Sequence, residues 1–238
     1  MVLLMLSTFA LGQPPAEVVT TQEVDNAIAD VTALTPADDP QRARLLALYN
    51  NTREALNDRD EFLDAREKFA KARSVAAKEA IAIGATLVER DVVPAALADS
   101  TSLPELEQQV QLSRAEVAES KNRLDEIRAE INSMPQRAAQ IRARLTELGS
   151  LIPDLQSGRA SLTQDEESDS INEASIWLAQ AQGASAIAEK AALDEGLLSQ
   201  PMRLQLLIAR QDRATLDIKQ LELHLSAMEQ RANSLRQG

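Results

Sequence analysis

His224 is the only histidine of the 238-residue chain, and the chain has no cysteine. A zinc site on a helix needs a second ligand three or four residues away, and those positions hold Gln220, Leu221, Ala227 and Met228. None of these side chains is a plausible zinc ligand. A Cys-His pair is impossible without cysteine, and a Ser-His-Asp triad would depend on this one histidine. We therefore expect His224 to lie beside a helix contact, with no metal bound.

Carboxylates are the other candidates for chemistry. Asp58, Asp60 and Glu61 stand close together, but Arg59 lies among them and the pattern is that of a solvated helix face. The acidic run over residues 165–169 lacks the spacing and the glycine of a calcium-binding loop. Neither a GxxxxGK[ST] nor a GxGxxG motif is present. We expect no enzyme activity, no cofactor, no metal and no small-molecule substrate.

The composition favours long helices over a globular enzyme. Aromatic residues make up only 2% of the chain, with one Trp, one Tyr and three Phe, so little bulk is available to line a pocket. The remainder is rich in Ala, Leu, Glu, Gln and Arg, which is typical of long helices and coiled coils. The net charge of −12 argues against a nucleic-acid partner, because that affinity comes from Lys and Arg neutralising phosphates.

Prolines and glycines divide the chain into long stretches of helical periodicity, and no stretch alternates like a strand. Pro40 suits the first position of a helix, and Pro135 should kink the helix that contains it. The expected elements are a helix over Ala16–Leu34, a helix from Pro40 to about Glu89, a linker over Asp91–Ser102, helical segments over Leu103–Met134 and Pro135–Leu148, a polar break over Pro153–Ser170, a helix over Ile171–Leu197, a stop over Gly196–Pro201 and a last helix.

An apolar residue recurs at alternating steps of three and four from Leu103 onward, and again in the last helix. This spacing is the signature of a helix-packing seam, because 3.5 residues per turn keep one stripe against a partner. It predicts an all-α fold, an elongated antiparallel helical bundle or coiled coil. The predicted seam residues are Leu103, Leu106, Val110, Val117, Leu124, Ile127, Ile131, Ile141, Leu145, Leu148, Leu207, Ile218, Leu221, Leu225, Met228 and Leu235.

The apolar run Val2–Gly12 is too short for the roughly 20 residues that span a bilayer. It suits a secretory signal peptide with cleavage before Gln13, although no Lys or Arg precedes it. The alternative is the start of a packed helix. The expected organisation is a signal peptide over 1–12, an N-terminal helical segment over 13–100, and long coiled-coil helices of the same domain over 101–238.

Three segments in order resemble one known family. Leu197–Arg236 is similar to the end of the MscS porin domain, the long helical periplasmic region of large mechanosensitive channels of the MscK/KefA kind. Asn122–Leu148 looks like the middle helix of that domain, and Pro40–Ala80, with RARLLALYNNTREAL, looks like its opening helices. The resemblance extends from about Glu17 to Arg236.

The resemblance implies an all-helical periplasmic extension of an inner-membrane channel, with no pore in this chain and no catalytic residues. Its expected partners are helices of the same or neighbouring protomers and an inner-membrane channel, with the membrane part encoded after residue 238 or separately. The alternative function is a stand-alone coiled-coil scaffold or adaptor of the cell envelope. A periplasmic hydrolase or binding protein would need a closed pocket with convergent polar groups.

Overall fold

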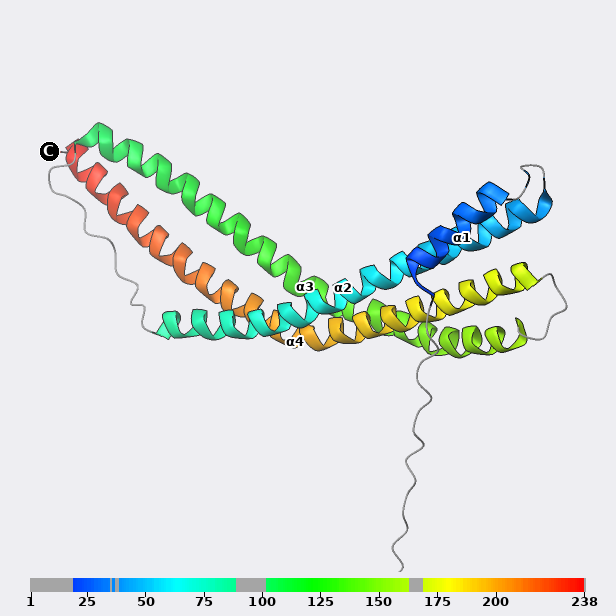
Figure 1. The fold of residues 1–238 in the computed structure, drawn as a ribbon. Helices are drawn as coiled ribbons and strands as arrows, with labels where there is room; N and C mark the ends of the chain where they lie inside the picture. The colour runs from blue at the N-terminus through cyan, green and yellow to red at the C-terminus, as the bar shows by residue number, and fades with distance from the viewer. Residues whose placement is uncertain (1–18, 35, 37–38, 89–101, 163–168, 238) are drawn as a thin grey trace, which may run out of the picture. The chain divides into compact units, whose positions relative to one another are not determined.

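The computed structural model describes residues 19–34, 36, 39–88, 102–162 and 169–237, without the side chains of 159–162. These residues form four helices, α1 (Thr21–Leu34), α2 (Pro40–Val88), α3 (Leu103–Leu162) and α4 (Asp169–Gln237) (Figure 1). Within these ranges the structure contains no strand. The all-α prediction is therefore confirmed. The predicted signal peptide and the linker over 91–101 lie outside the described residues.

Local hydrogen bonds explain where three of the helices begin. Thr20 precedes α1 and forms a capping box with Glu23: the Thr20 N–H donates to Glu23 Oε2 at 2.7 Å, and the Glu23 N–H donates to Thr20 Oγ1 at 3.3 Å. The backbone bond, and then the hydroxyl bond from Thr20, lower the pKa of Glu23. Ser102 and Glu105 make similar contacts at the start of α3. Asp39 caps α2 by accepting from the Gln41 N–H at 2.8 Å.

The first helix is shorter than predicted. Helix α1 begins at Thr21, after the Thr20 cap, and residues 16–18 of the predicted span lie outside the described residues. The second helix begins at Pro40 as predicted and extends for 49 residues to Val88. Pro40 is compatible with this start because the first N–H of a helix has no partner within the helix.

The predicted stop over Gly196–Pro201 is wrong, because α4 is one helix of 69 residues that passes through both positions. Gly196 and Ser199 are buried there, and the ring of Phe69 of α2 lies 3.5 Å from where a Gly196 Cβ would be. Glycine and proline weaken a helix by about 1 and 3 kcal/mol. Packing opposes this cost, since each buried large apolar side chain, such as Leu206 or Leu207, contributes about 1.5–3 kcal/mol.

Helix α3 is also continuous where breaks were predicted. It runs for 60 residues through Pro135, so the two predicted segments form a single element, and it continues past Pro153 to Leu162. Helix α3 thus occupies residues 153–162 of the predicted break, α4 begins at Asp169, and residues 163–168 lie outside the described residues. Extending a formed helix is far easier than nucleating one, and the Pro153 side chain is exposed.

The chain folds as two units. Unit 1 comprises Met1–Asp64 and Thr146–Ala191, and unit 2 comprises Ala65–Leu145 and Ala192–Gly238. In unit 1, α1 runs antiparallel to α2: Arg42 donates to the Thr32 carbonyl at 3.4 Å, and Arg53 pairs with Asp25 at 3.5 Å. These contacts place the short helix α1 along the first part of α2.

Unit 1 has a core in which α1, α2 and α4 meet. Val24, Leu56 and Ala174 are fully buried in it, one from each helix. The rings of Tyr49 and Trp177 lie 5.6 Å apart between centroids and are tilted by 55°. Burial, and secondarily the charge of Glu173, raises the pKa of Tyr49. The only tyrosine and the only tryptophan of the chain therefore belong to one core.

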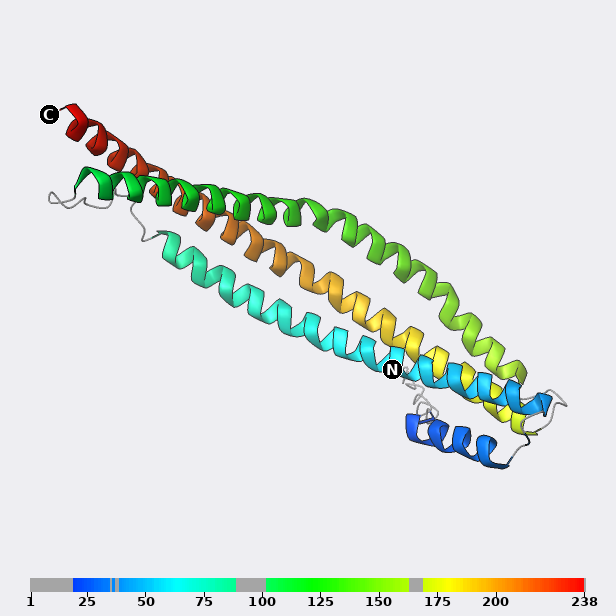
Figure 2. The same cartoon turned by 90° about the horizontal axis from the view of Figure 1, so that it is seen from above.

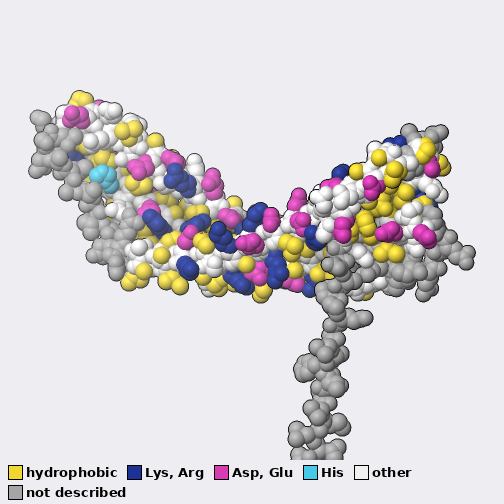
Figure 3. Space-filling view, in the orientation of Figure 1, with side chains coloured by type: hydrophobic (Ala, Val, Ile, Leu, Met, Phe, Trp, Pro, Cys, Tyr) yellow, Lys and Arg dark blue, Asp and Glu magenta, His cyan; other side chains and the backbone are white. Residues whose placement is uncertain are grey.

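In unit 2, α4 lies between α2 and α3 in both views (Figures 1 and 2). Helix α2 runs parallel to α4: Arg73 pairs with Glu195 at 3.2 Å, and Glu79 pairs with Arg210 at 2.8 Å further along both helices. Helix α3 runs antiparallel to α4. Acidic and basic side chains intermix on the visible surface of the helices (Figure 3).

Candidate functional site: the α3–α4 contact of unit 2

The predicted seam residues supply most of the buried surface of α3. Leu106 and Leu148 are almost completely buried, at 1% and 0% exposed. Leu148 belongs to unit 1, whereas the other predicted seam residues belong to unit 2. Buried seam residues of α3 are Leu106, Val110, Val117, Leu124 and Leu148, and half-buried ones are Leu103, Ile127, Ile131, Ile141 and Leu145.

On α4 the predicted seam residues differ more widely in exposure. Leu207, Ile218 and Met228 are buried and Leu221 and Leu225 are half-buried, but Leu235 near the helix end is exposed. The structure brings the first part of α3 and the last part of α4 into one apolar cluster. Its buried members are Leu106, Val110, Met228 and Ala232, with Leu103 and Leu225 packed against them.

Three ion pairs cross from α3 to α4 beside this cluster. Glu107 pairs with Arg236 at 2.7 Å, Arg114 with Glu229 at 2.7 Å, and Lys121 with Glu222 at 2.8 Å. From one pair to the next, the residue number increases by seven in α3 and decreases by seven in α4. This is the spacing of positions that flank the apolar contact between two antiparallel helices with a heptad repeat. We call these six residues the ion-pair ladder. All of them keep at least a third of the side chain exposed, so each pair contributes little to stability.

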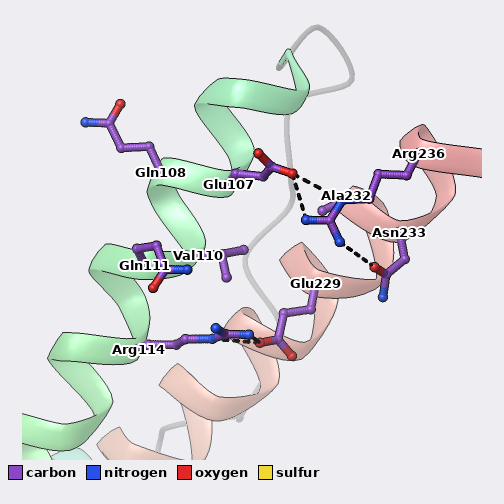
Figure 4. A pocket seen from close by; sticks show the side chains of 9 residues that line it. All are labelled: Glu107, Gln108, Val110, Gln111, Arg114, Glu229, Ala232, Asn233 and Arg236. Atoms are coloured by element: carbon purple, nitrogen blue, oxygen red, sulfur yellow. Dashed lines mark hydrogen bonds and ion pairs between the residues drawn. The ribbon is translucent and has the colours of Figure 1, made fainter.

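A groove of about 570 Å³ lies over the first two pairs of the ladder (Figure 4). Val110 and Ala232 form its apolar part, and Arg236 also donates to the Asn233 side chain at 3.1 Å. The charged side chains that line it point at one another from the two helices. The groove is therefore part of a helix contact in which acids and bases are already matched.

His224 is half-buried on α4, and its Nδ1 atom is buried without a hydrogen-bond partner among the residues that the structure describes. The structure contains no group of three or more acidic or histidine side chains suited to a metal ion, as far as the described residues show. Among those residues, no helix combines the length and apolarity needed to cross a membrane. The clearest feature of the described chain is thus a surface for helix packing.

The ion-pair ladder was not predicted from the sequence, although the sequence carries a signal for it. Its residues recur every seventh position, next to the predicted seam on each helix. Reading the charges beside the seam for complementary heptads would have identified the candidates. Which α3 residue meets which α4 residue still depends on the fold, because the partners are more than 100 positions apart in the chain.

Comparison with known families identifies a match over most of the chain. The model of the mechanosensitive ion channel porin domain, MscS_porin, matches residues 27–238, which include nearly all of the described helices. Comparison with curated proteins and with solved structures finds no match. The family agrees with the all-α fold and with the long helix contacts of unit 2. The chain belongs to the mechanosensitive ion channel porin domain family.

Proposed function

We propose that this chain is a structural and sensory helical extension of a mechanosensitive channel, lies in the periplasm and forms no part of the pore. The observation that carries the proposal is the family match over residues 27–238. The described helices support it, because long paired helices with matched charges are suited to transmit or resist displacement along their axes. The buried apolar side chains of α3 and α4 pack against each other within the chain. Contacts with partner helices would therefore form through the outer surface.

The proposed partners are helices of neighbouring protomers and of the channel itself. Large apolar side chains remain on the surface of unit 2, among them Ile81 and Val88 of α2, at 74% and 89% exposed, and Leu198 of α4, at 58%. Such side chains are available for contacts with further helices. In cells, cross-linking through a photoreactive residue at position 81 is expected to retrieve another copy of this chain or a channel subunit. If it retrieves neither, the alternative of an envelope scaffold gains support.

The periplasmic location rests on the apolar run Val2–Gly12, which fits a secretory signal. A fusion of alkaline phosphatase after residue 238 tests this, because the phosphatase is active only after export. N-terminal sequencing of the mature chain is expected to begin at Gln13. Phosphatase inactivity, with a green fluorescent protein fusion that fluoresces in the cytoplasm, would contradict the location.

Patch-clamp recording tests the sensory role. In the cells that make this chain, deletion of residues 27–238 is expected to leave the unitary conductance of the channel unchanged and to shift the tension at which it opens. A changed conductance would place the chain in the pore. An unchanged opening tension would contradict a sensory role and leave only a structural one.

A further inference from the structure

Helices α3 and α4 each carry a Ser-x-Pro segment in their interior. The segments are Ser133-Met134-Pro135 in α3 and Ser199-Gln200-Pro201 in α4, and both lie in unit 2. A third Ser-x-Pro, beginning at Ser102, starts α3, where proline is tolerated. The two interior segments are the ones that affect a continuous helix.

The same backbone arrangement weakens the helix in both places. Proline has no N–H, so the carbonyls four residues earlier, of Ile131 and Leu197, lose their helical donor. The hydroxyl of each serine donates to the carbonyl three residues earlier: Ser133 to Glu130 at 2.8 Å and Ser199 to Gly196 at 2.7 Å. Such back-bonding tends to bend helices, and proline is a usual site of sharp kinks.

The two segments lie within about two turns of each other along the α3–α4 pair. Glu130 of α3 and Arg203 of α4 form an ion pair at 3.9 Å. Pro135 follows Glu130 by five residues, and Pro201 precedes Arg203 by two. Because α3 and α4 are antiparallel, the step from Glu130 to Pro135 and the step from Arg203 back to Pro201 lead in the same direction along the helix axes. At about 1.5 Å per residue, this pair places the two prolines roughly 4–5 Å apart along the helices, whereas the register of the ion-pair ladder places them about 10 Å apart, or two turns.

Packing does not require either proline. Pro135 and Pro201 are both exposed, while Met134 and Ala138 beside the first are buried and hold α3 in the contact. Gly196 weakens α4 further, yet an alanine Cβ there would meet the Phe69 ring at an ordinary contact distance of 3.5 Å. The weak points of α3 and α4 therefore lie near each other, and at each of them the proline side chain is exposed.

We propose that the two interior Ser-x-Pro segments form one compliant joint of unit 2, at which α3 and α4 open and bend together. Helix α2 has no proline between Ala65 and Val88 and stays in contact through Phe69 and Arg73. The joint thus has two weakened helices beside one continuous helix. This inference concerns the chain itself and does not depend on the proposed function.

Hydrogen exchange of the full chain, followed by mass spectrometry, tests the joint. Peptides over 131–139 and 196–205 are expected to exchange about tenfold faster than those over 115–125 and 206–216, as local opening exceeds that of the flanks. Pro201→Ala restores the donor for the Leu197 carbonyl and should slow exchange at 196–205 by about tenfold. Because the segments open together, it should also slow exchange at 131–139.

Pro153→Ala is the matched control, since Pro153 is an exposed proline inside α3, has Leu151 at the serine position and belongs to unit 1. It should slow exchange near residue 153 and leave 196–205 unchanged. The exchange rate of each segment is divided by that of the flanking peptides in the same variant. A change in the global stability of a variant affects both rates and cancels in this ratio. Equal exchange at the segments and flanks of the unsubstituted chain would overturn the proposal. The proposal would also be overturned if Pro201→Ala slowed hydrogen exchange at 131–139 no more than Pro153→Ala does.

Discussion

Arg236 binds Glu107 across the α3–α4 contact with two donors, Nε at 3.1 Å and Nη2 at 2.7 Å from the same Glu107 oxygen (Figure 4). This pair has the acid on α3, whereas Arg114–Glu229 and Lys121–Glu222 have the base on α3. A shift of one heptad would bring Glu107 opposite Glu229, or Arg114 opposite Arg236. The reversed charge order of Glu107–Arg236 thus disfavours sliding α3 along α4 by one heptad in either direction. The apolar seam alone would permit such a shift, because it repeats every heptad.

Charge reversal tests the ladder through a double-mutant cycle. Glu107→Arg faces Arg236 with a like charge and is expected to lower the free energy of unfolding by up to about 1 kcal/mol. Adding Arg236→Glu restores an ion pair and should recover most of that loss in urea denaturation. In 1 M salt the Debye length falls to about 3 Å, so the coupling should nearly vanish. Effects that simply add at low salt would show that the pair does not interact.

A charge in the seam is expected to destabilise unit 2 far more than the same charge outside it. Leu124 is 6% exposed and Leu112, in the same helix, is 64% exposed. Leu124→Asp should cost several kcal/mol, about 3–5, whereas Leu112→Asp should cost about 0.5 or less. Thermal and urea melts followed by circular dichroism measure both, and Leu124→Ala, at about 2–5 kcal/mol, serves if the aspartate variant does not fold. Equal melts for Leu124→Asp and Leu112→Asp would contradict the seam.

The raised pKa of the buried Tyr49 leads us to expect a loss of stability at high pH. Burial raises its pKa above the ordinary tyrosine value of 10.0, so the folded chain retains the phenol proton at pH values where the unfolded chain loses it. The stabilisation is therefore complete below pH 10 and is lost as pH rises through the folded pKa. Tyrosinate absorbance near 295 nm reports this one group, because the chain has a single tyrosine. Tyr49→Phe should remove this component of the pH dependence, and a midpoint at or below 10.0 would refute the shift.

Alanine at position 196 is expected to stabilise α4. The added Cβ fits against Phe69 at 3.5 Å, and replacing glycine inside a helix contributes about 0.5–1 kcal/mol. Gly183→Ala is the control in the same helix, because nothing lies within 4 Å of its Cβ position and the propensity gain alone should appear. A lower melting temperature for Gly196→Ala, with a raised one for Gly183→Ala, would mean that the Phe69 contact cannot accommodate a methyl group.

Much of the fold class was readable from the sequence because helical periodicity is local. The three-four spacing from Leu103 and the scarcity of aromatic residues already predict long paired helices, and the resemblance over three segments predicts the family that the comparison shows. The start of α2 at Pro40 was likewise predictable from one residue. Such features depend on neighbours within a turn or two.

Helix ends could be predicted only where residues adjacent in the sequence determine them. Pro40 acts within one turn and its helix start was predicted, but Gly196 and Pro201 do not end α4, because burial of its face against Phe69 and its neighbours opposes their local preference. Periodicity alone also ranked Leu235 with Leu106, whereas one is exposed and the other buried. Burial depends on where the partner helix lies.

By itself, the sequence determined that the chain forms long helices with one apolar side, because that pattern repeats within each helix. The tertiary structure alone decided how those helices meet. It pairs Glu107 with Arg236, brings Pro135 within about two turns of Pro201, and joins Tyr49 to Trp177 in one core. These partners are separated by long stretches of chain, and only the packing of whole helices brings them into register.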